Sequence, residues 1–569
     1  MANVQGAGTQ QHTYDAIVVG SGISGGWAAK ELCEQGLKTL VLERGRDVKH
    51  GDYPTAMMES WEFAGRTKIS QAELAQQLKQ NRTGYTTHPA SAHWFVNDLE
   101  NPYSEDKPFD WMRGYHVGGR SLLWGRQSYR WSDLDFEANA KDGMSIDWPI
   151  RYRDIAPWYD HVERFAGISG NQDHLPQLPD GQFLPPMEMN CLEQQVRDRV
   201  RERFGGRAMI IGRAANLTQP HNGRGSCQSR NRCIRGCPYG AYFSSNAATL
   251  PAAYATGNLT LRPFSIVNQL LYDPDRRRAT GVRVIDAETS EAMEFHAKVI
   301  FLCASTVGST FVLLNSKSDR FPNGLGNDSG ELGHNLMDHH FKIGATGMSD
   351  DFADRYYRGQ RPNGIYVPRF RNLDRASTRK DYLRGFGFQG GANRVDWTRD
   401  IKELSLFGAK LKADLIAPGP WRFGIGQWGE CLPYHSNRMY LADGGRDKWG
   451  QPTVTFSCEW KENELAMRKD AMASAVEMLA AAGLKEVTPF DDGSNPGLCI
   501  HEMGTARMGR DPRTSVLNGW NQVHASPNVF VTDGSCMTSS SCVNPSLTYM
   551  ALTARACDHA VSELKKMNL

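Results

Sequence analysis

Three of the chain's twelve cysteines lie close together in the stretch CQSRNRCIRGCPYG. Five residues separate Cys227 from Cys233, three separate Cys233 from Cys237, and a proline follows. Thiolates at such spacings can bind iron or zinc, and a cysteine followed directly by proline is found in the cluster-binding loops of bacterial ferredoxins. A zinc ion would need a fourth ligand, which His221 could supply. From the spacing alone, an iron-sulfur cluster, a zinc site and three unligated thiols are all open.

A second group of residues suited to chemistry lies near the N-terminus. The apolar run YDAIVVG ends in a glycine, and Gly20, Gly22 and Gly25 form the pattern GxGxxG at the start of a predicted helix. The first glycine permits a tight turn, the second lets backbone approach a pyrophosphate, and the third allows the helix to pack closely on the strand. Glu43 ends the next predicted strand and can accept hydrogen bonds from ribose hydroxyls. A dinucleotide is therefore predicted to bind here.

The bulk composition is that of a globular protein without an unusual charge. The 569 residues are 40% hydrophobic and 22% charged, with a formal net charge of +2. This balance argues against long disordered segments, and it provides no strong electrostatic attraction to nucleic acid or to an anionic membrane. The first twenty residues lack the basic and apolar regions of an export signal, and no apolar run reaches the roughly 18 residues of a spanning helix. We expect no nucleic-acid partner, no membrane span and no export signal in this chain.

Strand and helix patterns in the rest of the chain predict two interleaved domains. The stretch GYHVGGRSLLWG has four glycines, including Gly118 and Gly119, which suit a backbone lying against a flat ligand. Residues 335–496 alternate as in half-buried strands and include one long helical pattern. The segment NVFVTDG and a helix from about Pro545 to Lys566 return to the first pattern. Between residues 258 and 304 we predict successive strands from the runs LTLRPF, VNQLLYD, ATGVRVID, AMEFHA and KVIFLCAS.

Six stretches, in order along the chain, resemble the glucose-methanol-choline (GMC) oxidoreductase family of flavoproteins. They are GSGISGG, HVGGRSLLWG, CASTVGSTFVLLNS, ELGHNLMDHH, HEMGTARMG and TDGSCMTSSSCVNPSLTYMALTARA. The resemblance implies an α/β fold, in which a Rossmann-type FAD-binding domain is interleaved with an α+β, sheet-based substrate domain. The FAD-binding domain would comprise residues 13–45, 110–130, 225–335 and 497–569, with the cysteine loop at 225–245. Residues 46–109, 131–224 and 336–496 would form the substrate domain and surface excursions.

The resemblance also implies how FAD is held. Asp533 and Gly534 would lie near its ribityl and phosphate part, and the helix after Pro545 would aim its positive end at the flavin ring. Some family members carry a flavin-linked histidine in the segment matching GGRSLLW. The comparable position here is Leu123, and His116 lies outside it, so noncovalent FAD is predicted.

The family's catalytic pair matches His501 and Asn544, which are 43 positions apart. A neutral imidazole can take the hydroxyl proton of an alcohol as hydride leaves its carbon. An asparagine amide can donate to the same oxygen. Without the resemblance, His501 would be read as a structural histidine and Asn544 as the cap of the helix after Pro545. The histidines of HNLMDHH, which are His334, His339 and His340, are not predicted to bind metal, because the stretch matches the family's domain-crossing segment.

The cysteine loop, with PYGA after its last spacing, resembles the insertion of a bacterial GMC subgroup that carries a 3Fe-4S cluster. The resemblance implies that Cys227, Cys233 and Cys237 bind the cluster, and that electrons leave one at a time to a partner. In the subgroup a small subunit pairs with the flavoprotein and a cytochrome c often receives the electrons. Because the small subunit commonly carries the export signal, a periplasmic location is expected by co-export, and a cytoplasmic one otherwise.

Other segments, such as LERGRDVKHGDYPTA and RQSYRWSDLDFEANAKDG, resemble the glucoside 3-dehydrogenases of that subgroup. This implies oxidation of the C3 hydroxyl of glucosides or disaccharides to 3-keto sugars. Three alternatives stay open: a gluconate- or fructose-type dehydrogenase, a sugar oxidase with a structural zinc, and a flavin-bearing electron-transfer module without turnover. Amide, acid and indole groups that could contact a sugar in the inserted domain are Gln389, Gln427, Trp428 and Glu430.

Overall fold

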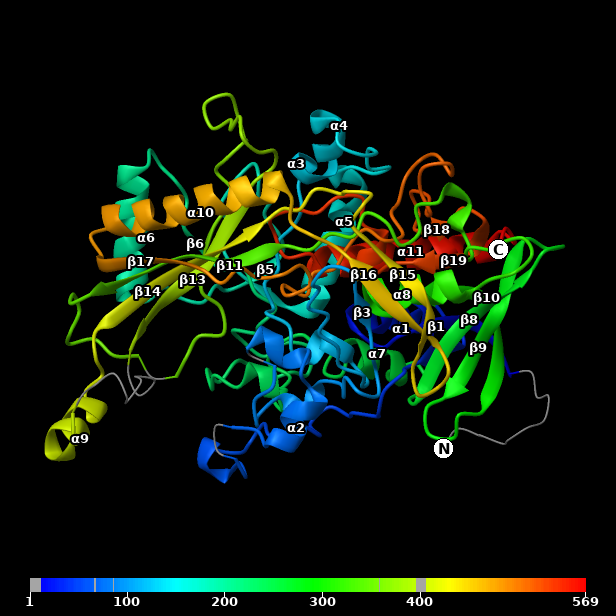
Figure 1. The fold of residues 1–569 in the computed structure, drawn as a ribbon, viewed down its shortest axis with the longest axis horizontal. Coiled ribbons are helices and arrows are strands. Elements are labelled where there is room, and N and C mark those ends of the chain that lie inside the picture. The colour runs from blue at the N-terminus through cyan, green and yellow to red at the C-terminus, as the bar shows by residue number, and fades with distance from the viewer. Residues whose placement is uncertain (1–11, 66–67, 85, 358, 396–405) are drawn as a thin grey trace.

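A computed structural model describes residues 12–65, 68–84, 86–357, 359–395 and 406–569. Two large sheets lie toward opposite ends of the molecule (Figure 1). In the described part of the chain the first sheet has eight strands, with β18, β19, β10, β1, β2 and β7 side by side and the β8–β9 hairpin added through β10. Its strands are β1 (His12–Val19), β2 (Thr39–Leu42), β7 (Leu259–Arg262), β8 (Ser265–Asp273), β9 (Arg278–Asp286), β10 (Ala292–Leu302), β18 (Gln522–Val523) and β19 (Ser526–Val531).

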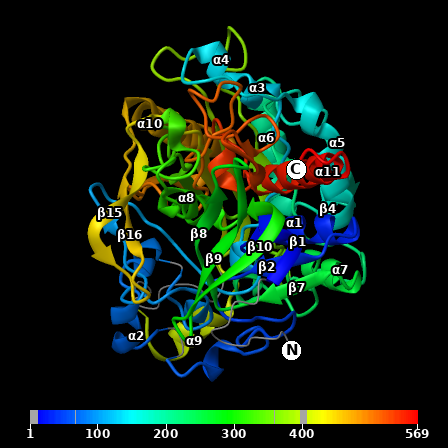
Figure 2. The same cartoon turned by 90° about the vertical axis from the view of Figure 1, so that its right-hand side faces the viewer.

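The centre of the first sheet is parallel and buried on both faces. Strand β1 pairs in parallel with β2 and β10, and β10 pairs in parallel with β19. Along β1, Ala16 and Val18 pack into one core cluster, whereas Ile17 and Val19 pack into another. A strand covered on both faces needs a continuous apolar run, which is what YDAIVVG supplies. Helices α1 (Ile23–Glu34) and α11 (Ser546–Lys565) pack against each other on one side of this sheet (Figure 2).

Strand β10 joins two runs that the sequence pattern separated. The predicted strands AMEFHA and KVIFLCAS form one strand, Ala292–Leu302. Its first residues pair antiparallel with β9, and those from Phe295 on pair in parallel with β1. No turn residue stands between the two runs, so the chain continues straight from the hairpin into the main sheet.

The second sheet is antiparallel and covered by helices on one face. Its order is β17, β11, β14, β13, β12, β6, and α10 (Glu462–Ala481) lies across it beside α6 (Cys191–Arg203) (Figure 1). The alternating side chains of β14 that point to this helix layer include Phe423 and Ile425. The strands are β6 (Ile210–Ile211), β11 (His340–Ser349), β12 (Ile365–Val367), β13 (Phe386–Arg394), β14 (Trp421–Gly429) and β17 (Lys485–Asp491).

The remaining elements connect or cover these two sheets. A small sheet combines β3 (Ser104–Glu105), β15 (Arg438–Arg446) and β16 (Pro452–Ser457), and β4 (Ile168–Ser169) pairs with β5 (Phe183–Leu184). The other α-helices are α2 (Gln71–Gln76), α3 (Asp133–Phe136), α4 (Ala138–Asp142), α5 (Tyr152–Ala166), α7 (Thr249–Ala255), α8 (Ser305–Asn315) and α9 (Gly408–Ile416). None of the helices in the described ranges has the length and apolarity that crossing a membrane would require.

The predicted α/β architecture, a Rossmann-type sheet together with a second sheet, is confirmed. The first sheet takes strands from residues 12–42, 259–302 and 522–531, and the second takes strands from 210–211 and 340–491. The exact domain boundaries proposed from the sequence stay a prediction.

Candidate active site and cofactor cavity

A long cavity runs through the first sheet's carboxyl edge and is lined by segments from distant parts of the chain. Its lining includes Glu43 and Tyr115 as well as His501 and Asn544. The lining segments include residues 19–24, 42–44, 111–115, 119–121, 124–127, 265–267, 303–308, 452–454, 500–502 and 533–534. Ligands of open parallel sheets bind at this edge, outside the ends of the strands.

The glycines of the first turn each have a separate steric reason. Gly20 has φ +94°, and a Cβ there would lie 2.6 Å from the carbonyl oxygen of Cys303. A Cβ on Gly25 would lie 1.9 Å from the carbonyl oxygen of Gly20. Gly22 has no atom within 4 Å of such a Cβ and lines the cavity. Of the three positions, a side chain introduced at Gly22 is therefore the one that would enter the space of a ligand.

The second glycine-rich stretch closes over the first. Gly118 (φ +88°) donates its backbone N–H to the Ser21 hydroxyl at 2.9 Å, and a Cβ on it would collide with Asn246. A Cβ on Gly119 would lie 3.4 Å from the Cα of Gly22 across the cavity. Leu123, at the position where some family members carry the flavin link, packs against a separate apolar cluster.

Polar groups along the cavity suit a dinucleotide. Glu43 is buried and accepts from the Ser21 backbone N–H at 3.1 Å, the Ser21 hydroxyl at 2.5 Å and the Gly45 N–H at 2.9 Å. Its burial raises the pKa of the carboxyl, while these hydrogen bonds oppose the shift. Thr453 and Tyr549 line the cavity, and their hydroxyls are buried without a partner in the described part of the chain. Such orphaned groups are satisfied when a polar ligand binds.

Three helices begin at this cavity. Ile23 of α1, Ser305 of α8 and Ser546 of α11 all line it. Helix N-termini carry partial positive charge and unpaired N–H groups, so they stabilise phosphates and other anionic groups. Pro545 directly precedes α11, and Asp533 accepts from the Ser535 N–H at 3.0 Å and the Ser309 hydroxyl at 2.5 Å. The residues along the cavity fit FAD.

The loop that carries His501 is held by a buried carboxylate. Asp338 accepts the backbone N–H groups of Gly497 at 2.8 Å and Cys499 at 3.1 Å on one oxygen, and that of His501 at 3.0 Å on the other. Burial and the charge of the nearby Glu502 together raise the pKa of Asp338 to about 7, against the effect of these hydrogen bonds. Holding three backbone N–H groups between residues 497 and 501 in this way fixes the position of the His501 imidazole.

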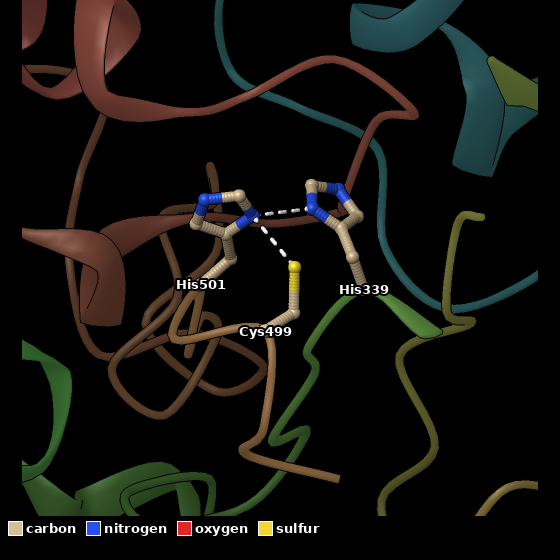
Figure 3. A group of neighbouring side chains, drawn as sticks. All are labelled: His339, Cys499 and His501. Carbon is tan, nitrogen blue, oxygen red and sulfur yellow. Dashed lines mark hydrogen bonds between the residues drawn. The ribbon is translucent and has the colours of Figure 1, made fainter. Parts of the chain in front are cut away.

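A chain of hydrogen bonds defines which nitrogen of His501 is free. Nε2 of His339 contacts the backbone carbonyl of Ser541, which can only accept, so this nitrogen carries the proton. Nδ1 of His339 is then the acceptor for Nδ1–H of His501, 2.7 Å away. The remaining nitrogen, Nε2 of His501, carries a lone pair and points away from His339 and Cys499 in Figure 3. Since His501 lines the cavity, Nε2 is the nitrogen available to a substrate.

Burial keeps both imidazoles neutral. It lowers the pKa of His339 to about 4. It also lowers the pKa of His501 well below its usual range, and the charges of His339 and Arg120 add to this effect. Arg120 itself makes a two-bonded ion pair with Glu502, at 3.1 and 2.8 Å. His501 is therefore in the form of a base at neutral pH.

Asn544 is held in one orientation by the second sheet. Its side-chain oxygen accepts from Nε2 of Gln389 at 2.6 Å, which leaves its NH₂ group as the part that can donate into the cavity. Gln389 lies on β13 between Phe388 and Gly390, on the face opposite the helix-covered one. This strand therefore reaches from the second sheet into the site.

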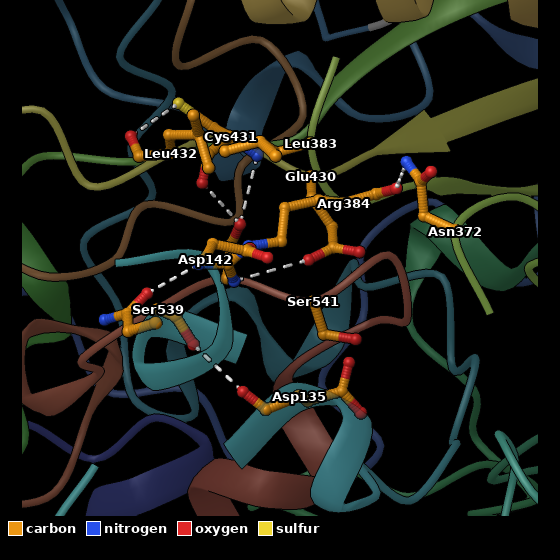
Figure 4. Close-up of polar contacts among 12 residues, drawn as sticks. Asp135, Asp142, Asn372, Leu383, Arg384, Glu430, Cys431, Leu432, Ser539 and Ser541 are labelled. Carbon is orange, nitrogen blue, oxygen red and sulfur yellow. Dashed lines mark hydrogen bonds and ion pairs between the residues drawn. The ribbon is translucent and has the colours of Figure 1, made fainter. Parts of the chain in front are cut away.

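The other three residues predicted to contact sugar lie differently. Trp428 is on the same face as Gln389 and interacts with the Cys499 thiol through its side chain. Gln427 is on the helix-covered face, fully buried, and bonds Nδ1 of His340 at 2.6 Å. Glu430 is buried and pairs with Arg369 at 2.8 Å. It also lies 3.9 Å from Arg384, which Figure 4 shows beside it. None of the three lines the cavity as described, and their role toward substrate stays a prediction.

The cysteine loop packs beside the same cavity. Its 3-10 turn η5 (Cys233–Arg235) contacts η4 (Gly119–Leu122), which lines the cavity. The Tyr242 hydroxyl lies 2.7 Å from the Leu122 carbonyl oxygen and 3.0 Å from that of Cys233, and so joins the two turns. The loop thus lies one side-chain layer from the cofactor cavity.

The three thiols of the loop lie close enough to influence one another's charge. The charges of Cys233 and Cys237 reinforce the effect of burial in raising the pKa of the Cys227 thiol. Backbone N–H groups point at the sulfurs, from Ser229 to Cys227 at 3.4 Å and from Tyr239 and Ala241 to Cys237. Such donors stabilise thiolate ligands of iron-sulfur clusters. The loop fits a cluster.

Zinc geometry is not formed in this loop. A tetrahedral zinc ion brings ligand sulfurs to less than about 4 Å from one another. Within the described ranges, the one group of three or more ligand atoms within 4.8 Å of one another is that of His339, Cys499 and His501. His221 instead has its Nε2 against the Arg164 carbonyl oxygen at 2.8 Å.

Sequence reasoning missed several residues around the base. His339 and Asp338 lie in ELGHNLMDHH, which was read only as a domain crossing, although its D-H pair was the available signal. Arg120 stands in the glycine-rich stretch, but nothing in the sequence links it to Glu502. Gln389 was singled out for the substrate, and the structure shows it bound to Asn544.

Comparisons with known proteins place the chain in a family. A family model described as GMC oxidoreductase matches residues 14–341, and a second with the same description matches residues 433–553. The chain is 29% identical to 2-methyl-1,2-propanediol dehydrogenase of Mycolicibacterium austroafricanum, over 96% of this chain and 94% of that one. It is 25% identical to the fructose dehydrogenase large subunit of Gluconobacter japonicus, over 97% and 98%.

The fold is also found among solved structures. Aspergillus oryzae RIB40 formate oxidase, studied for modification of its FAD, superposes with a TM-score of 0.62 at 13% identity, over 98% of this chain and 100% of that one. This likeness concerns the fold. On the two family matches, the larger of which covers more than half of the sequence, the chain belongs to the GMC oxidoreductase family.

Proposed function

We propose that this GMC oxidoreductase oxidises a secondary hydroxyl of a glucoside or disaccharide, with His501 as base, and passes the electrons through a cluster at the cysteine loop to a partner protein. Its class, an FAD-dependent alcohol or sugar dehydrogenase, follows from the family and from relatives that are named dehydrogenases. The observation that carries the proposal is that a neutral imidazole and an oriented amide both line the cofactor cavity.

The chain's residues would divide the work on the alcohol as follows. The hydroxyl proton passes to Nε2 of His501, whose Nδ1–H stays bonded to His339. The NH₂ group of Asn544 donates to the same oxygen as negative charge develops on it. FAD, when bound, supplies a two-electron acceptor for the hydride of the carbinol carbon. The product is a ketone, and general-base catalysis of this kind contributes about 100- to 10,000-fold.

Orientation of the two polar groups matters as much as their presence. Gln389 keeps the oxygen of Asn544 turned away from the alkoxide, where it would repel negative charge. His339 keeps the proton of His501 off the nitrogen that must accept. Both devices are fixed before substrate arrives, which is how preorganised sites lower barriers without reorganising.

The cysteine loop supports a route for the electrons. Trp124 and Arg126 line the cavity, and the Arg126 charge acts on the Cys227 thiol. A cluster at Cys227, Cys233 and Cys237, when bound, would supply a one-electron carrier next to the cavity. Because the hydride brings two electrons, the enzyme would release them singly to another protein. Assembly with further subunits is in line with the relative named as a large subunit, and co-export with such a partner is the proposed route to a periplasmic location.

The substrate assignment rests on sequence resemblance and has a direct test. Purified holoenzyme is given methyl glucoside or sucrose with an artificial electron acceptor, and the product is treated with alkali, in which 3-keto sugars absorb strongly. We expect that absorbance, and His501→Ala should abolish it while retaining FAD. A product that is not a 3-keto sugar would refute the regiochemistry.

The cluster is tested separately. Electron paramagnetic resonance of fresh wild-type protein should show an oxidised 3Fe-4S signal. Cys237→Ser should lose the signal and slow acceptor reduction, while sugar still reduces the flavin without air. Cys191→Ser, a matched change of a half-buried free cysteine on α6, should alter neither. Zinc in place of iron, with hydrogen peroxide formed in air, would instead support an oxidase.

A second candidate is a ketose- or aldonate-type dehydrogenase with the same cofactors. It is favoured by the match to a fructose dehydrogenase large subunit over nearly the whole chain. Fructose and gluconate belong in the same assay, and turnover of either without 3-keto product would select this alternative.

A further inference from the structure

Three potential metal ligands meet on the side of His501 that faces away from the cavity. Nδ1 of His339, Nδ1 of His501 and Sγ of Cys499 all lie within 4.8 Å of one another (Figure 3). We propose that these three residues form an inhibitory binding site for a borderline divalent ion, Zn²⁺, which switches off the base. The inhibitory consequence rests on the proposed role of His501, whereas the binding site itself does not.

The three distances lie near those of a zinc site, and the one from the Cys499 sulfur to Nδ1 of His339 is at most 4.8 Å. Zinc bonds of about 2.0–2.1 Å to nitrogen and 2.3 Å to sulfur, in a tetrahedron, put two nitrogens about 3.4 Å apart and a nitrogen and a sulfur about 3.6 Å apart. The Cys499 sulfur already lies 3.4 Å from Nδ1 of His501. The two imidazole nitrogens are 2.7 Å apart, so the rings must separate by about 0.7 Å. His501, at the cavity wall, can move more easily than the fully buried His339.

The surroundings already provide what ligands of a metal need. Metal-bound histidines usually donate their other N–H to a carbonyl or carboxylate. His339 does so to Ser541. A side-chain hydrogen bond from Trp428 reaches the Cys499 sulfur and lowers the pKa of its thiol. These contacts orient two of the three ligand atoms toward the third without a metal present.

The local charge also favours a cation. Asp338 and Glu502 are buried near Cys499, and Asp338 accepts the Cys499 backbone N–H at 3.1 Å. Arg120 offsets the charge of Glu502, whereas Asp338 accepts from the backbone N–H groups of Gly497, Cys499 and His501. A doubly charged ion would relieve this excess of negative charge.

Binding would remove the base by moving one proton. The Cys499 thiol loses its proton to solvent as the sulfur–zinc bond forms. The proton on Nδ1 of His501 shifts to Nε2 as Nδ1 becomes a ligand. Nε2 then carries hydrogen and cannot accept the substrate's proton, so one proton is released per ion and turnover stops.

Inhibition is tested on the holoenzyme with its cluster in place. We expect Zn²⁺ to inhibit sugar-dependent dye reduction and a chelator to restore it. Relative to each variant's own rate without metal, Cys499→Ala should raise the half-inhibiting Zn²⁺ concentration about tenfold or more. Cys557→Ala, a change of an equally buried cysteine on α11, should leave it unchanged. Equal Zn²⁺ sensitivity of the Cys499 variant would overturn the proposal.

Binding is tested without turnover by titrating Co²⁺. A sulfur-to-cobalt charge-transfer band should form in the wild type and in Cys557→Ala, and be missing in Cys499→Ala. Absence of the band from the wild type would refute the site, even if Zn²⁺ inhibits elsewhere. Because the band does not depend on sugar oxidation, failure of the proposed function and failure of this site give different results.

Discussion

The backbone carbonyl of Ser541 determines the tautomer of His501 through the intervening His339. Ser541 fixes the proton of His339, His339 fixes the proton of His501, and the free lone pair faces the cavity. Imidazole alone would populate both tautomers, and only one can act as a base here. Burial also lowers the pKa of both imidazole rings, so that both are neutral at neutral pH.

The activity should depend on pH only below the ordinary histidine range. His501 must be neutral, and its lowered pKa means that protonation begins well under pH 6.5. We expect kcat/KM to be level from about pH 8 down past 6.5 and to fall only at lower pH. An acid limb centred at or above 6.5, in initial rates over this range, would show that His501 is not the buried base.

Replacing His339 should impair chemistry more than binding. In His339→Leu the Nδ1–H of His501 loses its acceptor, so part of the population carries the proton on Nε2. We expect kcat to fall about tenfold with little change in KM, and the acid limb to move as the neighbouring ring is lost. A merely structural role would lower stability and leave the pH profile of the surviving activity in place.

Gln389 should act through the orientation of Asn544. Gln389→Leu removes the donor and leaves the amide free to rotate. Gln389→Glu puts an acceptor against the Asn544 oxygen, so the amide should turn over and point its oxygen at the alkoxide. We expect kcat to fall in both, and further in Gln389→Glu, with the FAD content unchanged. Equal rates in the two variants would contradict the orientation argument.

At the scale of elements, the turn between β1 and α1 has one glycine that faces the cavity and another that packs the helix against the strand. An alanine at Gly22 meets no atom within 4 Å and points into the cavity, whereas one at Gly25 meets the Gly20 carbonyl oxygen at 1.9 Å. Gly22→Ala should weaken FAD binding about tenfold or more while the apoprotein keeps its Tm.

Gly25→Ala is the matched control at the same turn. It should destabilise the apoprotein by about 1–3 kcal/mol, because the helix must move off the strand. Fluorescence titration with FAD and thermal melts of both apoproteins give the two readouts. A lowered Tm in Gly22→Ala would mean that this position supports packing as well.

Local patterns predicted the elements well, and long-range partners poorly. The apolar run before Gly20 specifies β1 because it must be buried on both faces. The pattern predicts AMEFHA and KVIFLCAS as two strands, because it cannot show that a single strand, β10, pairs with β9 over its first residues and with β1 further along. His501 and Asn544 were named through the family resemblance. The residues that orient them are His339, just before β11, and Gln389, on one face of β13. Only the fold brings these residues together.

At the scale of the whole molecule, the first sheet lines the cavity, and the second sheet helps to position its two polar groups. The base comes from a loop anchored by Asp338 just before β11, and the amide of Asn544 is held by β13 of the second sheet. The cofactor end belongs to the first sheet. A bound dinucleotide therefore contacts segments from residue 19 to residue 549, and its binding energy becomes stability of the assembled molecule.

Removal of FAD should accordingly lower the thermal stability of the protein, and added FAD should raise that stability more than FMN does. At a free concentration of 100 times Kd, a ligand that binds only the folded state adds about 2.7 kcal/mol of stability. We expect thermal melts of the apoprotein to shift upward with FAD. FMN lacks the adenosine that would reach Glu43 and Tyr115, so its shift should be smaller at equal concentration. Equal shifts with both flavins would mean that the adenosine end of the cavity contributes nothing to binding.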